Sequence, residues 1–127
     1  MKVITAGDAT SNLQPMDPAH FTGRTSSTSL IGAGTAGSMF AAIVRFEAGV
    51  RNHWHSHGGG QVLHVVEGEG WVQLRDQPPA RIRKGDTVVA APNEEHWHGA
   101  ARRGAMAHLA IGMGETRWLE ESAAPSE

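Results

Sequence analysis

Short stretches in which apolar and polar residues alternate follow one another closely from about residue 39 to residue 112 of this 127-residue chain. Such alternation indicates half-buried β-strands, because successive side chains of a strand point to opposite faces. Turns rich in Gly, Pro, Asn and Asp separate the stretches, and no long amphipathic helix interrupts them. The pattern predicts one all-β domain, folded as an antiparallel barrel or jelly roll. The expected strands cover residues 39–47, 52–57, 61–66, 71–75, 81–83, 87–91, 96–99 and 105–112.

The two ends of the chain have different compositions. Residues 1–28 are polar with few bulky side chains, and we expect them to form an arm that packs on a domain of residues 29–114. Residues 115–121 could form one or two helical turns, and residues 122–127 are expected to be a frayed tail. Residues 32–37 match the pattern G-x-G-x-x-G, but no helix pattern follows. We interpret them as a flexible loop, not as a dinucleotide-binding turn.

Charge and composition exclude several classes of partner. The chain has 11 Lys plus Arg against 13 Asp plus Glu, so no strong overall field attracts nucleic acid or anionic membranes. Cysteine is absent, which excludes disulfides and thiolate ligands, so any metal must be held by nitrogen and oxygen. No apolar run has the length of a signal peptide or a membrane span. A cytoplasmic protein is therefore the expectation.

Five of the eight histidines fall in two short windows, one with His53, His55 and His57 and the other with His96 and His98. In extended strands, residues two apart share a face, so two imidazoles from one strand and one from a distant strand can converge on one ion. An amide oxygen from the strand that follows the first window would add a neutral ligand. The spacing predicts a four-ligand metal site formed by His55, His57, Gln61 and His96. Gln61 has an alternative role, a hydrogen bond to a ligand histidine.

Three imidazoles and one amide carry no negative charge. A divalent ion held by them would keep its full positive charge, and would be a stronger Lewis acid than one bound by a carboxylate. These ligand types suit the ions from manganese to zinc. Four protein ligands also leave positions open on a five- or six-coordinate ion, which chemistry at the metal requires.

The spacing in both windows resembles the two sequence motifs of the cupin family. In the first motif this chain has Gln61 where most cupins have Glu, and in the second it has Ala100 where Asn is usual. The resemblance covers about residues 39–112 and implies a single-domain jelly-roll barrel that pairs into a homodimer through its outer β-sheets. The first motif is carried by Gly49, His55, His57, Gln61 and Gly68, and the second by Gly85, Asp86, Pro92 and His96.

A narrower resemblance is to the small bacterial cupins that include manganese-dependent hydroxynitrile lyases. It implies that His55, His57, Gln61 and His96 bind manganese, with iron, nickel, cobalt and zinc as alternatives. It also implies that His108 is an acid/base residue and that His98 lies in the pocket, although either could be a core histidine. The chain departs from that group at Gly58-Gly59, which loosens the turn. It also departs at His53, whose register places it inside as a pocket residue, a partner of a ligand histidine or a rival ligand. The resemblance is carried by residues 21–23, 54–57, 60–61, 96–100 and 106–111.

Period-two alternation also places three other side chains outside the barrel wall. His64 alternates away from Gln61, and Trp54 and Trp97 each lie between histidines that we expect to face inward. We therefore expect structural or interfacial roles for these three residues. The turn carboxylates Glu94 and Glu95 are expected to be solvated.

Three functional hypotheses remain open. The first is a metal-dependent carbon–carbon lyase that acts on a small hydroxylated molecule, with His108 or His98 accepting the hydroxyl proton. The second is an iron-dependent dioxygenase, or an isomerase, of a small molecule. The third is a metal- or ligand-binding module without turnover.

Overall fold

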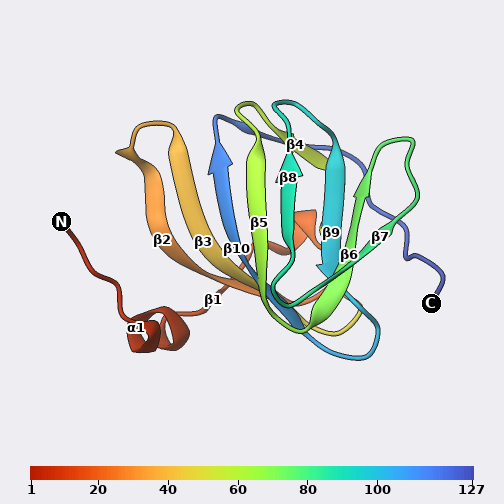
Figure 1. Cartoon of the computed structure of the whole chain (residues 1–127), viewed down its shortest axis with the longest axis horizontal. Coiled ribbons are helices and arrows are strands. Elements are labelled where there is room, and N and C mark those ends of the chain that lie inside the picture. Colours follow the sequence, from red (N-terminus) through yellow and green to blue (C-terminus); the bar gives the residue numbers. More distant parts are fainter.

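The computed structural model describes all of residues 1–127, except the side chains of Thr10 and of residues 33–35. Almost all the regular structure is β-strand, with one short α-helix and one 3-10 turn near the N-terminus (Figure 1). The elements are α1 (Ala6–Ser11), β1 (Gln14–Pro15), η1 (Pro18–His20), β2 (Thr25–Ala36), β3 (Met39–Phe46), β4 (His55–His57), β5 (Gln61–Glu67), β6 (Glu69–Leu74), β7 (Ala80–Arg83), β8 (Thr87–Ala90), β9 (His96–Ala100), β10 (Met106–Met113) and β11 (Thr116–Trp118).

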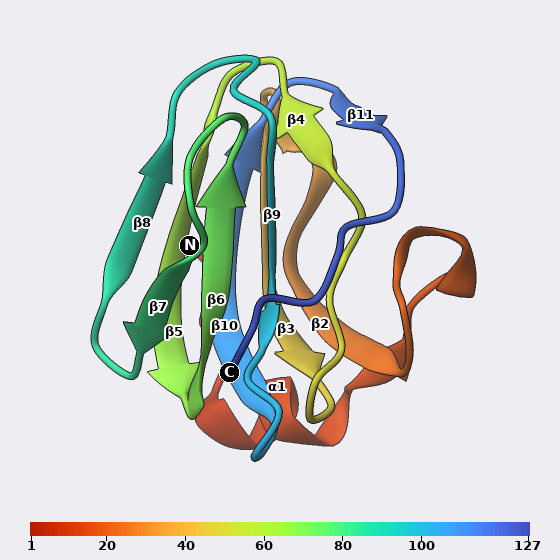
Figure 2. The same cartoon turned by 90° about the vertical axis from the view of Figure 1, so that its right-hand side faces the viewer.

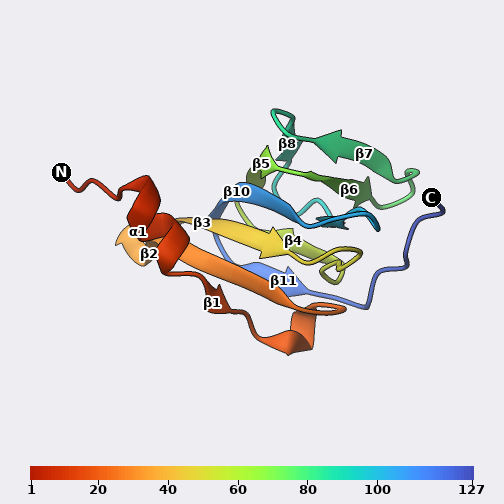
Figure 3. The same cartoon turned by 90° about the horizontal axis from the view of Figure 1, so that it is seen from below.

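The strands form two sheets that pack face to face. The six-stranded sheet has the order β1-β2-β3-β10-β5-β8, and the five-stranded sheet has the order β11-β4-β9-β6-β7. Seen from below, β7 and β8 lie on one side of the molecule, and β1, β2 and β11 lie on the opposite side (Figure 3). All the pairings are antiparallel, and the two sheets form an open barrel. The expected all-β jelly roll is confirmed.

The core lies between the sheets and follows the alternation in the sequence. On β5, Leu63 and Val65 face inward and are buried, whereas His64 is exposed on the outer face as expected, where its Nδ1 contacts the Thr87 hydroxyl. Phe46 and Met106 pack against the same inner surface from β3 and β10. Burying each of these apolar side chains contributes about 1.5–3 kcal/mol, which explains why this register is preferred over a one-residue slip.

The expected arm over residues 1–28 differs from the structure at its C-terminal end. β2 begins at Thr25, which pairs with Phe46 of β3, so residues 25–28 belong to the sheet and not to the arm. We expected a flexible loop over residues 32–37. β2 instead continues to Ala36, so this expectation is wrong at Gly32 and Ala36. The side chains of residues 33–35 are not among those described. The polar side chains of β2 lowered the strand signal, but they suit the sheet because pairing with β3 satisfies their backbone groups.

The predictions for the C-terminal segment are wrong. In place of a helix, Thr116–Trp118 forms β11 and pairs with β4, because the edge of β4 offers backbone partners that a local helix would leave unpaired. The tail is not frayed at Ser122, which is only 4% exposed. Its Oγ donates to the Asn52 carbonyl oxygen at 2.8 Å, and Arg51 donates to both its Oγ and its carbonyl oxygen. Figure 2 shows this segment crossing over β9.

The outer face of the five-stranded sheet is covered within the single chain. Trp97 points away from the inner face as expected, but it is fully buried and donates its indole N–H to Gln73 Oε1 at 2.7 Å. The guanidinium of Arg75 lies 4.0 Å from the centre of the Trp54 ring and forms ion pairs with Glu95 and Glu120. Glu95 is therefore ion-paired, and its side chain is still 37% exposed, in keeping with the expected solvated turn carboxylate.

No helix in the described chain is long and apolar enough to cross a membrane.

We predict that Ser122→Ala lowers the free energy of unfolding by about 1–3 kcal/mol, because it removes two side-chain hydrogen bonds and leaves the buried Asn52 carbonyl without its partner. Urea unfolding followed by circular dichroism measures this change. Ser126→Ala is the matched control, because Ser126 is exposed on the same segment, and it should change stability by less than about 0.5 kcal/mol. Equal stabilities of the two variants would contradict a docked tail.

Candidate metal centre

A cavity of about 250 Å³ opens between the two sheets and contains most of the chain's inward-facing histidines. Four of the six predicted site residues come from the five-stranded sheet, His55 and His57 on β4 and His96 and His98 on β9. Gln61 on β5 and His108 on β10 come from the opposite sheet. The rest of the wall is apolar. The lining residues that carry polar or titratable groups are Asn52, His55, His57, Gln61, His98, His108 and Thr116.

The predicted ligand histidines are brought together by the pairing of β4 with β9. His55 lies directly opposite His96 in the ladder, and their ring centroids are 4.4 Å apart. His57 follows His55 by two residues on the same face, with ring centroids 5.1 Å apart. All three are buried. The convergence expected from alternation is therefore present in the structure.

In each of these three rings one nitrogen, Nδ1, is engaged in a hydrogen bond outside the cluster. His55 Nδ1 donates to the His53 carbonyl at 2.8 Å, and His96 Nδ1 donates to the Glu94 carbonyl at 2.9 Å. A carbonyl can only accept, so both rings carry hydrogen on Nδ1 and a lone pair on Nε2. His57 Nδ1 contacts the Thr116 hydroxyl at 3.0 Å. This arrangement, with Nδ1 anchored and Nε2 free, is that of a metal-binding imidazole.

Two further observations fit a cation among these rings. His57 Nε2 is buried and has no hydrogen-bond partner among the described residues. Gln61 Oε1 lies 3.0 Å from His96 Nε2, so two lone pairs face each other. A positive ion between them would satisfy both acceptors; alternatively, rotating the amide by 180° would give a donor to His96. Both roles expected for Gln61 are therefore compatible with its position.

Distance alone selects a different set of three ligands. One ring nitrogen from each of His55, His96 and His98 lies within 4.8 Å of the others, and this group omits His57. In His98, however, both nitrogens have partners: Nδ1 lies 3.0 Å from His108 Nε2, and Nε2 lies 3.2 Å from Asn52 Nδ2. A ligand nitrogen needs an unshared lone pair. His57 Nε2 has one and the His98 nitrogens do not, so the hydrogen bonding favours His57 over His98 as a ligand.

Burial keeps the cluster uncharged. Desolvation lowers the pKa of His57 to about 4, and the neighbouring His96 adds to the effect. Burial also lowers the pKa of His108 to about 4. Burial also places the pKa values of His55 and His98 well below the ordinary value, and the neighbouring histidines lower them further. Burial lowers the pKa of His96 as well. At neutral pH the rings are therefore neutral, as metal ligands and general bases must be.

Two expectations about the first window are wrong. His53 does not line the cavity, because β4 starts only at His55 and the alternation does not extend back to it. Its main chain instead anchors His55 and donates to the His20 carbonyl. The Gly58-Gly59 turn is not loose, since the amides of Gly58 and Gly59 donate to the Glu115 and Met113 carbonyls. A Cβ on Gly59 would come within 2.6 Å of Met113 Cβ, so close packing requires glycine there.

Sequence reasoning missed several residues that shape the site. Asn52 accepts a hydrogen bond from the His98 main chain with its Oδ1 at 2.9 Å. Trp118 packs on His55, with ring centroids 4.7 Å apart, and stacks on His20 at 4.3 Å. Thr116 and Trp118 lie in the segment expected to be helical, so alternation gave no signal for them. Asn52 precedes the strand by three residues and has no pattern of its own.

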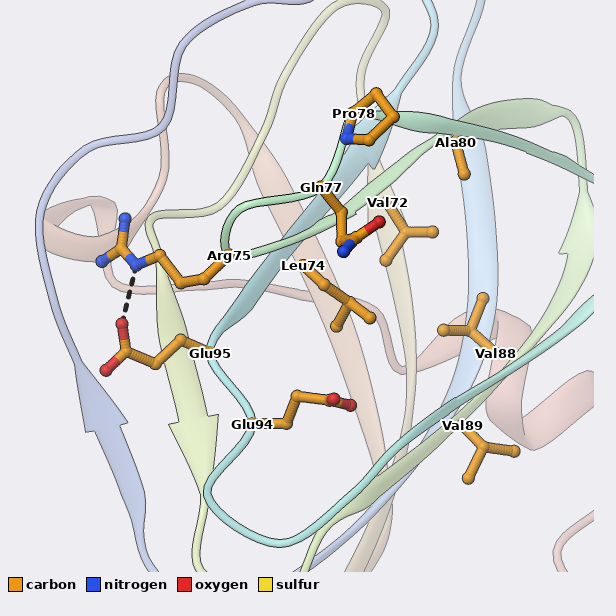
Figure 4. A pocket seen from close by; sticks show the side chains of 10 residues that line it. All are labelled: Val72, Leu74, Arg75, Gln77, Pro78, Ala80, Val88, Val89, Glu94 and Glu95. Atoms are coloured by element: carbon orange, nitrogen blue, oxygen red, sulfur yellow. Dashed lines mark hydrogen bonds and ion pairs between the residues drawn. The ribbon is translucent and has the colours of Figure 1, made fainter.

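A larger cleft lies away from this cluster, beside the edge strands β7 and β8. Its volume is about 550 Å³, and its wall is mostly apolar, with the Arg75–Glu95 ion pair at one side (Figure 4). No histidine occurs among its described lining residues. The imidazole donors therefore line the smaller cavity and not this larger cleft.

Comparison with known proteins agrees with this architecture. Residues 42–112 match the family model of the cupin domain. The chain is 40% identical over 111 residues to an (R)-mandelonitrile lyase from Granulicella tundricola, an alignment that covers 87% of this chain and 83% of that protein. Both findings concern the region that carries the histidine cluster.

Solved structures show the same fold. A cupin-like protein from Thermotoga maritima is 36% identical with a TM-score of 0.82, and the match covers 86% of each chain. A DMSP lyase from Ruegeria pomeroyi has a TM-score of 0.73 at 20% identity, covering 91% of this chain and 66% of that one, and is similar in fold alone. The structure has a cupin jelly roll and a three-histidine group that could hold a divalent metal ion. The family match and the similarity to the lyase show that the chain belongs to the cupin family.

Proposed function

We propose that this protein is a metal-dependent lyase that cleaves the carbon–carbon bond of a small hydroxynitrile. The observation that carries the proposal is that a hydrogen-bonded pair of neutral histidines, His98 and His108, lines one cavity together with His55, His57 and Gln61. Metal ligands and a general base are the two components that this chemistry needs. The similarity to a mandelonitrile lyase supports the same reaction class.

The ion would be held by the Nε2 atoms of His55, His57 and His96 and by Gln61 Oε1. We expect manganese, with iron, nickel, cobalt or zinc as alternatives that the same nitrogen and oxygen donors accept. When bound, a divalent ion supplies Lewis acidity that lowers the pKa of a substrate hydroxyl. Because all four donors are neutral, the protein does not cancel the charge of the ion.

The histidine pair would move the proton. His98 Nδ1 and His108 Nε2 are 3.0 Å apart and share one hydrogen. The nitrogen without that hydrogen would accept the hydroxyl proton when the substrate hydroxyl replaces this contact. As the O–H bond breaks, a carbon–oxygen double bond forms and the bond to the nitrile carbon breaks. The electron pair leaves with cyanide, which then takes the proton back from the imidazolium to give hydrogen cyanide. Burial favours this return, since it destabilises the charged ring.

The apolar walls would select the organic part of the substrate. Phe21, Phe40, Val44, Ala110 and Trp118 line the cavity around the donor cluster. Aromatic and aliphatic surfaces of this kind bind an aryl or alkyl group by excluding water from it. A cavity of about 250 Å³ suits a small molecule with one ring.

We predict that the purified protein supplied with manganese releases benzaldehyde from mandelonitrile, measured by ultraviolet absorbance. His108→Ala should lower kcat about 100-fold or more, because the proton acceptor is lost. His64→Ala should leave the rate unchanged, because His64 is exposed on the outside of the barrel. Absence of aldehyde with manganese, iron, cobalt, nickel and zinc alike would remove the lyase assignment. Oxygen consumption with ferrous iron would then favour a dioxygenase.

Metal content of the purified variants tests the ligand set. His57→Ala should reduce bound metal at least about tenfold, because it removes a ligand nitrogen. His98→Ala should keep close to the wild-type content, because both of its nitrogens already have hydrogen-bond partners. Elemental analysis after dialysis measures both, with His64→Ala as the control. The reverse order, with metal lost in His98→Ala and kept in His57→Ala, would assign the ligands to His55, His96 and His98.

We predict that the metal-free protein loses stability as the pH falls from about 6.5 towards about 4. The pKa of His108 is about 4 in the folded chain, against an ordinary value of 6.5. The unfolded chain therefore binds more protons between these values, so lowering the pH favours unfolding. For His108 alone the loss by pH 5 is about 2 kcal/mol.

Urea unfolding of the metal-free chain at pH 7.5 and pH 5 checks this pH dependence. His108→Phe should show a smaller difference between the two pH values than wild type, whereas His64→Phe should keep the wild-type difference. An unchanged difference in His108→Phe would mean that this ring does not titrate as a buried neutral group.

A further inference from the structure

Asn52 is tied to His98 by both its main chain and its side chain. The residue is 3% exposed and lines the cavity. Its main-chain N–H donates to the His98 carbonyl at 3.0 Å, and its side-chain oxygen accepts from the His98 main-chain N–H at 2.9 Å. Because that N–H can only donate, the amide atom facing it must be the oxygen. The orientation of the Asn52 amide is therefore determined by the fold.

The other atom of the amide, Nδ2, faces the imidazole of His98. It lies 3.2 Å from Nε2 and 3.4 Å from Nδ1. An amide NH₂ can only donate, and Nδ1 is already closer to His108 Nε2, so we assign the acceptor lone pair to the nearer nitrogen, Nε2. In a neutral ring the single hydrogen then belongs to Nδ1.

The same logic extends to the next ring. His98 Nδ1 lies 3.0 Å from His108 Nε2. If Nδ1 carries the hydrogen, it donates to His108 Nε2, and the hydrogen of His108 is on its own Nδ1. We propose that Asn52 is a positioning residue that sets the tautomer of His98 and thereby assigns the lone pair of the histidine pair to His108 Nε2.

Asn52 is in turn held by the C-terminal segment. Ser122 Oγ donates to the Asn52 carbonyl at 2.8 Å, and Arg51 donates to Ser122 Oγ at 3.2 Å. A single direction of hydrogen bonding thus runs from Asn52 through His98 to His108. In this direction His108 Nε2 carries no hydrogen of its own and can take the substrate proton when the hydroxyl replaces the His98 contact. In the opposite direction His108 Nε2 already carries a hydrogen and cannot accept another.

The test observes the hydrogens on the imidazole nitrogens by nitrogen–proton correlation spectroscopy of the full-length chain, labelled with ¹⁵N-histidine. The chain is kept metal-free, so that no metal on Nε2 can mimic the effect of Asn52. In wild type, His98 should carry hydrogen on Nδ1 and none on Nε2, and His108 should carry hydrogen on Nδ1. A spectrum of His98→Gln identifies the His98 signals. Hydrogen on His98 Nε2 in wild type would overturn the proposal.

Asn52→Asp keeps the shape of the side chain but replaces the donor with an acceptor. The carboxylate should draw a hydrogen onto His98 Nε2, and Asn12→Asp, on an exposed residue, should leave the histidine spectrum unchanged. A folded Asn52→Asp protein with His98 Nε2 still bare would contradict the proposal. If this variant does not fold, the wild-type spectrum alone still decides.

The consequence for turnover rests on the proposed lyase function and is measured separately. With metal content equal to wild type, Asn52→Asp should lower kcat for mandelonitrile about 100-fold and leave KM within about twofold, because proton transfer is impaired and binding is not. An unchanged kcat would mean that the tautomer does not matter to catalysis. If wild type shows the expected tautomers but cleaves no mandelonitrile, the lyase assignment fails and the role of Asn52 stands.

Discussion

The site depends on one backbone contact, the pairing of β4 with β9 at His55 and His96. β4 is only three residues long, so its direction is set by this contact on one side and by β11 on the other. Once His55 lies opposite His96, the strand period of two places His57 in the same cavity and places His98 within reach of His108. A one-residue slip of this register would turn these rings to the outer face.

Most of the fold follows from local alternation, which the sequence displays directly. The strands from β3 to β10 lie within a few residues of the predicted ranges, because all except β4 bury apolar side chains in the same core. The convergence of His55, His57 and His96 could be predicted for the same reason. The spacing of these histidines is visible locally in the sequence. The pairing of β4 with β9, which brings His96 to the other two, was supported by the family resemblance.

The remaining parts of the site depend on long-range partners that leave no local pattern. Thr116 and Ser122 lie in a segment without alternation, and they become ordered because β4 and Asn52 offer hydrogen-bonding groups that would otherwise be buried alone. Asn52 itself lies outside the regular strands. Its role in the site depends on contacts with His98, which is 46 positions away in the chain. Sequence reasoning therefore located the donor atoms but not the groups that orient them.

The absence of a carboxylate among these buried rings has an electrostatic consequence that connects binding with catalysis. A glutamate at position 61 would favour protonated imidazoles beside it and would partly neutralise a bound cation. The amide of Gln61 carries no charge, and although its hydrogen bonding raises the pKa of His57, burial and the neighbouring histidines outweigh this and keep the rings neutral. Neutral rings have no ion pair to orient them, so hydrogen bonds and packing do. This is why carbonyls, a threonine hydroxyl and the Asn52 amide surround the cluster, each fixing or limiting which nitrogen carries a hydrogen.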